Sequence, residues 1–308
     1  MNSMNLKDMN KPKTVIFILG PTAVGKTKLS INIANKLRTD IISCDSRQFY
    51  KELLIGSAPP NRQQLSEIKH HFIHHLSVTE DYNAGDFEID AIEKISELHK
   101  KHDILVCVGG SGLYVNAICE GFDKIPKISN NLRNLLNNKF NEEGLIWLQK
   151  EVEKIDSVFF NNCDINNPQR LLRALEVYRS TGKKLSSLKS KTKKSRPFNI
   201  IKIGLETQRL LLYERINNRV DKMIEDGLLE EVKSLLYFKD KNALQTVGYR
   251  ELFDFYNHNC SLEEAISNIK KNTRRLAKRQ LTWFKRDKDI TWFNTNQNKE
   301  INRFISRL

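Results

Sequence analysis

The sequence has no long uninterrupted apolar segment. Its apolar runs, such as residues 14–19, are far shorter than the about 20 residues that a helix needs to cross a bilayer. Residues 1–12 are polar and lack the apolar centre of a secretory signal. We therefore expect a protein without a membrane span, which begins with a flexible tail over residues 1–12.

Cysteine is also scarce, and its spacing does not suit cross-linking. The five cysteines are an odd number, and no two of them have the C-x-x-C spacing. This pattern argues against a disulfide framework and against a zinc site. Unpaired thiols are typical of a reducing compartment, so we predict a cytoplasmic protein.

Acidic residues are missing from two stretches, 183–196 and 272–286, although both contain several Lys and Arg. The whole chain carries 51 Lys and Arg against 37 Asp and Glu, a formal net charge of +14 at pH 7. Concentrated positive charge attracts polyanions, because binding releases their condensed counterions. The charge distribution therefore favours a polyanionic partner such as a nucleic acid.

Short apolar runs separated by helical stretches predict an α/β fold with a parallel sheet. The expected strands lie within residues 14–19, 41–46, 103–110 and 200–206. Ligands of such sheets bind at the carboxyl ends of the strands. We expect the side chains that follow these strands to converge on one crevice.

The pattern changes between residues 126 and 197. This segment is rich in Leu, Asn, Lys and Arg at helical spacing and contains no convincing strand. We predict an all-helical insertion domain over 126–197. The α/β core would then be built from residues 13–125 and 198–308, and its second part would carry the C-terminal helices.

The strongest motif follows the first apolar run and fits the phosphate-binding pattern G-x-x-x-x-G-K-[ST]. Its residues are Gly20, Pro21, Thr22, Ala23, Val24, Gly25, Lys26 and Thr27. A P-loop of this kind binds polyphosphate with backbone N–H groups and a helix N-terminus, and Lys26 adds a charge. Thr27 is a natural ligand for Mg²⁺. The motif predicts a P-loop NTPase-like sheet, but it does not specify the polyphosphate, and ATP or GTP is its usual ligand.

Asp45 ends the second apolar run and is followed by the polar and aromatic string SRQFY. One interpretation is a magnesium-binding acid like that of an ATPase. The other is a general base that faces an acceptor substrate. The spacing alone does not separate the two.

A second glycine-rich turn, VGGSGLY at residues 108–114, follows the third apolar run. Ser111 within it could donate a hydrogen bond to a phosphate or a carboxylate. No acid stands at the end of this run, which argues against a conventional NTPase.

The HHFIHH cluster at residues 70–75 contains two histidine pairs at i, i+4 spacing. A zinc site would need a third ligand, and no obvious one lies nearby in the sequence. We favour a structural or substrate-channel role for this cluster.

Several further motifs occur in a fixed order along the chain. After GPTAVGKT come DSRQFYKELLIGSA, HHFIHHLSV, VGGSGLY, NPQRLLRALEVYRSTGK, RINNRVDKMIEDGLLEEV, TVGYREL and TRRLAKRQLTWFKR. Together, over residues 13–293, they resemble the tRNA dimethylallyltransferase family, also called the tRNA isopentenyltransferase family. No zinc-finger pair follows the last motif, so the chain is similar to the short bacterial form.

This resemblance implies that the P-loop holds the pyrophosphate of dimethylallyl diphosphate. The prenyl group would pass to N6 of the adenosine on the 3′ side of the anticodon, in tRNAs that read codons beginning with U. Asp45 matches the family's catalytic aspartate. Ser111 stands where the family more often has threonine, and it keeps the hydroxyl near Asp45. By resemblance Lys26, Arg219 and Mg²⁺ on Thr27 stabilise the leaving pyrophosphate.

The resemblance also implies contacts with the anticodon stem-loop of tRNA. The implied contact residues are Asp45, Ser46, Arg47, Gln48, Ser111, Arg133, Asn167, Pro168, Gln169, Arg170 and Leu171. Asn167 stands where family members commonly have Asp. Without the resemblance, Gln169 and Arg170 would be read as part of a solvated helix face.

Residues 272–286 also fit an amphipathic helix with Leu276, Leu281 and Trp283 packed inward and a basic face turned outward to phosphate.

Two other functions compete with prenyl transfer. The first is a small-molecule kinase in which the P-loop binds ATP and Asp45 orients an acceptor hydroxyl. The second is a non-enzymatic RNA-binding protein with a structural P-loop. The order of the motifs favours the prenyltransferase, and no sequence feature resembles a dimer seam, so we expect a monomer.

Overall fold

The computed structural model describes residues 12–123, 125–189 and 192–307 of the 308-residue chain. The predicted tail lies outside the described residues except for Pro12. The described chain divides into two compact units. The first comprises residues up to Cys119 together with those from Arg196 onward, and the second is Glu120–Ser195.

The first unit is built on a sheet of six parallel strands in the order β3-β2-β4-β1-β5-β6. The strands are β1 (Thr14–Leu19), β2 (Ile41–Ser43), β3 (His70–His71), β4 (Ile104–Gly109), β5 (Asn199–Glu206) and β6 (Ile290–Asn294). The predicted parallel α/β fold is therefore confirmed. All four predicted strands are present, and β3 and β6 at the sheet edges were not predicted.

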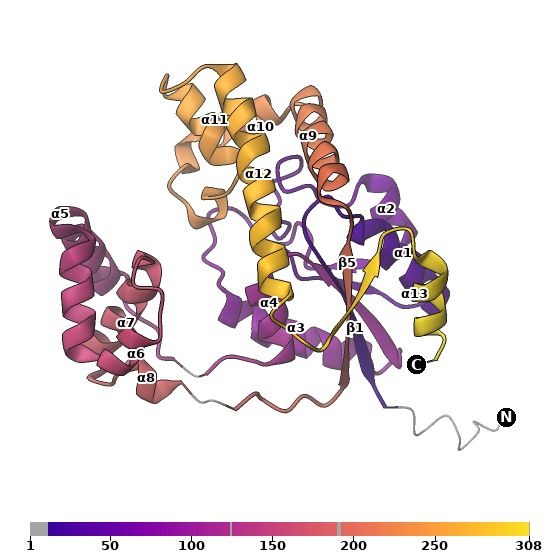
Figure 1. Cartoon of the computed structure of the whole chain (residues 1–308), viewed down its shortest axis with the longest axis horizontal. Coiled ribbons are helices and arrows are strands. Elements are labelled where there is room, and N and C mark those ends of the chain that lie inside the picture. Colours follow the sequence, from indigo (N-terminus) through magenta and orange to yellow (C-terminus); the bar gives the residue numbers. More distant parts are fainter. Residues whose placement is uncertain (1–11, 124, 190–191, 308) are drawn as a thin grey trace. The chain divides into compact units, whose positions relative to one another are not determined.

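Helices pack on both faces of this sheet and beyond its carboxyl edge (Figure 1). The helices of the first half are α1 (Lys26–Leu37), α2 (Arg62–Glu67), α3 (Ala84–Leu98) and α4 (Gly112–Cys119). Those of the second half are α9 (Arg209–Glu225), α10 (Leu228–Ser234), α11 (Tyr249–Tyr256), α12 (Leu262–Phe284) and α13 (Asn298–Ile305), with two 3-10 turns, η2 (Leu236–Phe238) and η3 (Asn242–Leu244). Figure 1 shows α9, α10 and α11 gathered where β5 ends, so these helices stand above the edge at which ligands bind.

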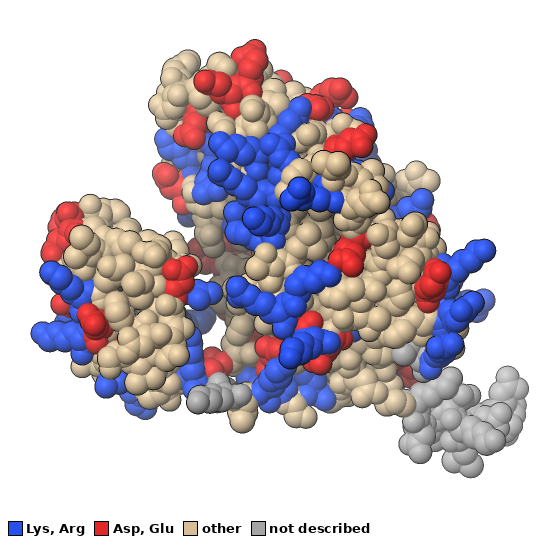
Figure 2. Space-filling model, in the orientation of Figure 1, with Lys and Arg blue, Asp and Glu red and all other residues tan. Residues whose placement is uncertain are grey.

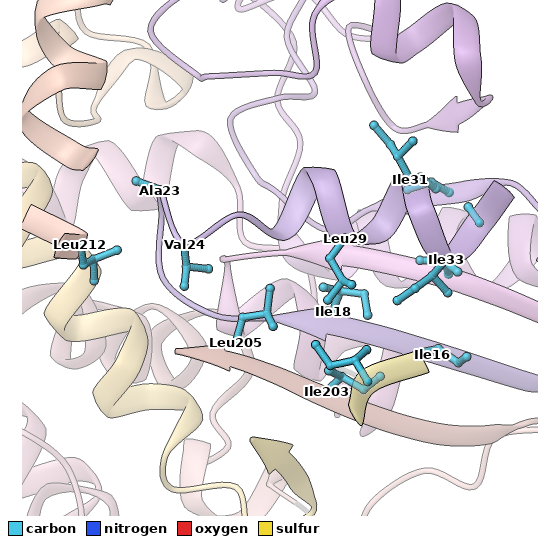
Figure 3. Packing of buried hydrophobic residues seen from close by; sticks show 14 of the residues in the cluster. Ile16, Ile18, Ala23, Val24, Leu29, Ile31, Ile33, Ile203, Leu205 and Leu212 are labelled. Carbon is cyan, nitrogen blue, oxygen red and sulfur yellow. The ribbon is translucent and has the colours of Figure 1, made fainter. Parts of the chain in front are cut away.

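The central strands are buried because both of their faces are covered. All six residues of β1 are buried, as expected for a strand between two layers of helices. Figure 3 shows Ile16 and Ile18 of β1 beside Ile203 and Leu205 of β5. Each such side chain contributes about 2 kcal/mol of hydrophobic stabilisation on burial. This core fixes the end of β1, from which the P-loop departs.

Helices are the only regular secondary structure among the described residues of the second unit. It contains α5 (Asn130–Ile155), α6 (Ser157–Asn161), α7 (Pro168–Thr181) and α8 (Leu185–Leu188). Gly144 breaks the regular backbone of α5 with a φ of 77°. Leu148 and Val152 of α5 pack with Leu171 and Leu175 of α7 in a core of its own. The unit therefore has the hydrophobic cluster expected of a small independent domain.

Within the described residues, no helix is both long enough and apolar enough to cross a bilayer.

Candidate active site

The P-loop joins β1 to α1 and leaves the start of that helix open. Gly25 is the N-cap of α1, with a φ of 107° in the left-handed region, and no side chain caps the helix. Ala23 also has a positive φ of 64°. The first N–H groups of a helix have no partner within it, so an uncapped start next to a left-handed turn is a site for an anion. This local structure agrees with the predicted polyphosphate cradle.

Lys26 lies at the first position of α1. Its Nζ donates a hydrogen bond to the carbonyl oxygen of Pro21 at 2.7 Å, which holds the ammonium over the loop. Burial lowers the pKa of Lys26 to about 8, while the charge of Asp45 opposes that change and the charge of Arg219 adds to it. Lys26 therefore lies close to both an acid and a second cation.

Arg219 reaches the same loop from α9. Its Nη1 donates to the Thr22 hydroxyl at 3.3 Å. Burial lowers the pKa of Arg219, and the neighbouring Asp45 carboxylate acts in the opposite direction. The fold thus brings Lys26, Arg219 and Asp45 together from segments that are far apart in the sequence.

The turn that carries Asp45 begins directly after β2. Asp45 Oδ1 accepts a hydrogen bond from the Arg47 N–H at 3.1 Å, and the Asp45 N–H donates to Ser43 Oγ at 3.4 Å. This arrangement is an Asx turn, in which the aspartate side chain replaces a backbone acceptor. It fixes the carboxylate at the carboxyl edge of the sheet, beside the P-loop.

Ser111 joins this group from the turn between β4 and α4. Its Oγ accepts a hydrogen bond from the Ser46 N–H at 3.2 Å and lies 3.3 Å from Ser46 Oγ. Two turns that the sequence separates by 65 residues are therefore in direct contact. The hydroxyl of Ser111 lies next to the residue that follows Asp45.

Arg47 and Gln48 make hydrogen bonds to their own chain. Arg47 donates to the carbonyl oxygens of Asn242, Ala243 and Gln245 at 2.7, 3.2 and 3.4 Å. Gln48 Nε2 donates to the carbonyl of Ala58 at 3.1 Å. Both side chains thereby hold the Asp45 turn against neighbouring loops.

The NPQR motif forms the start of α7 in the second unit. The side chain of Asn167 caps this helix by accepting the Arg170 N–H at 3.3 Å, and Pro168 occupies the first turn. Gln169 and Arg170 are exposed. Leu171 is fully buried, and its side chain packs in the core of the unit.

Two arginines of the second unit share one buried carboxylate. Arg133 Nε and Arg173 Nη1 each lie 3.2 Å from an oxygen of Glu176. Glu176 is only 6% exposed, whereas the side chains of Arg133 and Arg173 are 47% and 36% exposed. The Glu176 carboxylate therefore pairs with both guanidinium groups, while part of each arginine side chain stays exposed.

The histidine cluster is not helical, so its i, i+4 pairs do not share a helix face. His70 and His71 form β3, and the segment after them is a turn in which His74 has a φ of 48°. His71 Nε2 lies 2.8 Å from Asp40 Oδ2. His75 packs edge-on against Phe49. In the part of the chain that the structure describes, no group of three or more His, Cys, Asp or Glu is placed to hold a metal.

Gln280 of α12 also belongs to the site, although nothing in the sequence singles it out. Its Oε1 accepts the Thr22 N–H at 2.8 Å, and its Nε2 donates to the Gly110 carbonyl at 3.0 Å. Trp283, one helical turn later, lies against Gly112. In the sequence, Gln280 and Trp283 are related only by i, i+3 spacing on a predicted helix. That spacing does not show which turns the two side chains contact.

The expected inward packing on α12 is correct in part. Leu276 and Leu281 are half-buried, but Trp283 is 36% exposed. The most buried residues of α12 are Ala265, Ile269, Ala277 and Phe284.

A basic surface lies over α12. Figure 2 shows Lys and Arg side chains gathered on this helix. The exposed basic residues of α12 include Lys271, Arg275, Lys278 and Arg279. Such a concentration of charge suits the backbone of a nucleic acid.

Sequence comparison gives a consistent result across nearly the whole chain. The family model described as "IPP transferase" matches residues 48–287. The chain is 51% identical to a tRNA dimethylallyltransferase of Christiangramia forsetii, over 93% of this chain and 95% of that protein. It is 49% identical to a protein of the same name from Flavobacterium psychrophilum, over 91% of this chain and 93% of that one.

Solved structures agree with the sequence matches. A full-length tRNA isopentenylpyrophosphate transferase from Bacillus halodurans has a TM-score of 0.71 at 37% identity, and the match covers 96% of both chains. A eukaryotic dimethylallyltransferase, whose structure was solved acting on tRNA, has a TM-score of 0.80 at 28% identity. That match covers 96% of this chain and 80% of the eukaryotic one.

Proposed function

Because the chain belongs to the IPP transferase family, we propose that it prenylates tRNA. The dimethylallyl group of dimethylallyl diphosphate passes to N6 of the adenosine at position 37, next to the anticodon, in tRNAs that read codons beginning with U. The products are N6-dimethylallyladenosine and diphosphate. The single observation that carries this proposal is the approach of Lys26, Arg219 and Asp45 to one another beside an uncapped P-loop.

The leaving group is the first chemical requirement. Breaking the bond between the allylic carbon and its oxygen leaves negative charge on the diphosphate. The N–H groups at the start of α1, Lys26 and Arg219 stabilise that charge because they are held in place before the reaction begins.

The nucleophile is the second requirement. The exocyclic nitrogen of adenine is weak because its lone pair is delocalised into the ring. As the new carbon–nitrogen bond forms, the nitrogen loses a proton, and Asp45 accepts it as general base. The hydroxyl of Ser111, held beside the Asp45 turn, orients the acceptor nitrogen.

We further propose that Mg²⁺ accompanies the diphosphate. Magnesium usually takes one or two protein oxygens and completes its shell with water and substrate phosphates, so it does not need a dense cluster of acids. The Thr27 hydroxyl, in the first turn of α1 beside Lys26, fits this habit. The bound ion would supply positive charge to the departing diphosphate.

The tRNA partner must present its adenosine outside the anticodon stack, because an enzyme cannot reach N6 in a closed loop. Exposed Gln169 and Arg170 support the predicted RNA contact by α7, and the basic face of α12 supports a contact with the RNA backbone. One chain supplies every residue of the proposed chemistry, which supports a monomer. The free cysteines of the chain support a cytoplasmic location.

The experiment uses labelled dimethylallyl diphosphate, unmodified tRNA and Mg²⁺ without ATP, followed by nucleoside analysis. We expect dimethylallyladenosine at position 37. The Asp45→Asn variant should bind tRNA like the wild type and lose about 10²- to 10⁴-fold in turnover, the usual contribution of a general base. A parallel reaction contains ATP as well. Consumption of ATP there, with no label on the RNA in either reaction, would instead favour the kinase, and full turnover in Asp45→Asn would remove Asp45 as the base.

A further inference from the structure

Gln280 is the one side chain of α12 whose two ends are hydrogen-bonded to two different turns of the candidate site, among the contacts that the structure describes. The amide oxygen takes the N–H of Thr22 in the P-loop, and the amide nitrogen binds the carbonyl of Gly110 in the turn before Ser111. These turns lie at the ends of β1 and β4, which are neighbours in the sheet. The side chain therefore links the turn at the end of β1 to the turn at the end of β4.

The contact with Thr22 acts on the leaving-group side. The same threonine accepts the hydrogen bond of Arg219 through its hydroxyl. A hydrogen bond that fixes the Thr22 backbone therefore also fixes the Thr22 hydroxyl oxygen, which accepts the hydrogen bond from Arg219.

The contact with Gly110 acts on the acceptor side. Gly110 immediately precedes Ser111, whose hydroxyl accepts the Ser46 N–H. Ser46 in turn follows Asp45. Holding the Gly110 carbonyl therefore holds the serine that lies against the Asp45 turn.

The glycines of this turn show how closely α12 approaches. A Cβ atom on Gly110 would lie 2.5 Å from Gln280 Nε2. A Cβ on Gly112 would overlap the indole of Trp283. α12 therefore rests closely on the VGGSG turn: a Cβ at position 110 would displace the end of the Gln280 side chain, and a Cβ at position 112 would displace the Trp283 indole.

We propose that Gln280 is a positioning residue that sets the separation between the diphosphate cradle and the acceptor side of the site. This inference rests on the proposed function and deepens it. A group-transfer reaction is sensitive to such a separation, because displacement of the reacting groups by about 1 Å costs on the order of 10²-fold in rate. Both ends of the Gln280 amide are engaged by the protein backbone, so its loss should affect the rate of transfer more than the binding of either substrate.

The test compares Gln280→Met and Gln280→Glu with the wild type under saturating substrates. Methionine fills the space but makes neither hydrogen bond, and glutamate keeps the acceptor for Thr22 while placing a carboxylate against the Gly110 carbonyl. We expect kcat to fall about 10- to 100-fold in both. The dissociation constants for inorganic pyrophosphate, by calorimetry, and for unmodified tRNA, by filter binding, should change by less than about threefold, which is under 1 kcal/mol.

A matched control is Gln63→Met on the exposed face of α2, which should leave every measurement unchanged. A second test uses Gly110→Ala, which pushes the glutamine amide away without altering Gln280 itself. We expect this variant to lose kcat as Gln280→Met does. The Gly110→Ala/Gln280→Ala double variant should lose no more than Gln280→Ala alone, because both changes remove the same contact.

An unchanged kcat in Gln280→Met overturns the inference. So does a parallel loss of melting temperature, pyrophosphate binding and kcat, since that pattern marks a residue needed only for folding. Additive losses in the double variant also overturn it. If the wild type forms no prenylated adenosine, both the proposed function and this inference are wrong. If the wild type is active and Gln280→Met is equally active, only this inference is wrong.

Discussion

At the scale of single residues, the site is defined by how burial and neighbouring charges act on a few side chains. Lys26 and Arg219 are cations held beside the Asp45 carboxylate. Removing a charged group from water costs free energy unless another charge compensates it. Here one acid faces two cations, so the site keeps an excess of positive charge, and a diphosphate is the type of ligand that neutralises it.

Lys26 gives this balance a pH dependence. Its pKa of about 8 lies below the ordinary lysine value of 10.5 because burial disfavours the charged form. Below pH 8 the free protein therefore carries the ammonium, and above pH 8 it loses that charge. We expect the dissociation constant for inorganic pyrophosphate, measured by calorimetry, to rise by up to about tenfold between pH 8 and pH 9 as the proton is lost.

The control for this prediction is Lys26→Arg. Arginine stays protonated throughout this range, so the variant should show a much flatter profile, whatever its absolute affinity. The same rise in both proteins would show that another group titrates.

At the scale of elements, the turn after β2 and the η3 segment act as one piece. Arg47 joins them by donating to three backbone carbonyls of residues 242–245. A planar guanidinium can serve several acceptors at fixed angles, which a single ammonium cannot do. The family resemblance alone implied an RNA contact for this arginine.

Substitution of Arg47 separates these two roles. If Arg47 positions the loop, Arg47→Lys and Arg47→Met should both lower kcat by about 10-fold or more, since both lose the carbonyl contacts. The slope of log K for tRNA against log salt should stay that of the wild type. A phosphate contact gives a different result, because Arg47→Met would then lower the slope by about one unit while Arg47→Lys would preserve it.

The position of each strand in the sheet explains which strands the sequence could predict. β1, β4 and β5 are central strands, and burial on both faces requires the apolar runs that the sequence displays. β3 has only two residues and β6 lies at the opposite edge, so neither needs a continuous apolar run. The sequence of residues 70–75 carries no sign of strand pairing, because its histidines show neither an apolar run nor an alternating pattern.

At the scale of the whole molecule, the chain consists of an α/β unit interrupted by a helical one. The two ends of the interruption meet within the first unit, since Arg196 Nε donates to the carbonyl of Ile118 at 2.7 Å. Each unit has its own buried cluster. These features are those of an inserted domain, which a core can accept without changing its own packing.

Excision of residues 120–195 tests this organisation. With a short Gly-Ser linker between Cys119 and Arg196, we expect the α/β unit to unfold cooperatively on heating and to bind pyrophosphate within about threefold of the full chain. Its affinity for unmodified tRNA should fall at least about tenfold, because the basic helical unit is gone. Unchanged tRNA affinity would place the RNA contacts outside the second unit.

The sequence by itself determined the P-loop, the parallel sheet with its central strands, the helical nature of the insertion and the family. These features depend on local spacing and on long apolar runs, which a chain carries in its linear order. Only the tertiary structure decided that Arg219 and Lys26 face Asp45, that Arg47 is bound to its own backbone, that Leu171 is buried and that Gln280 links two glycine-rich turns. These contacts join residues up to 258 positions apart, and their partners are mostly backbone atoms, which every residue possesses. The pattern of side chains along the sequence therefore cannot predict these contacts.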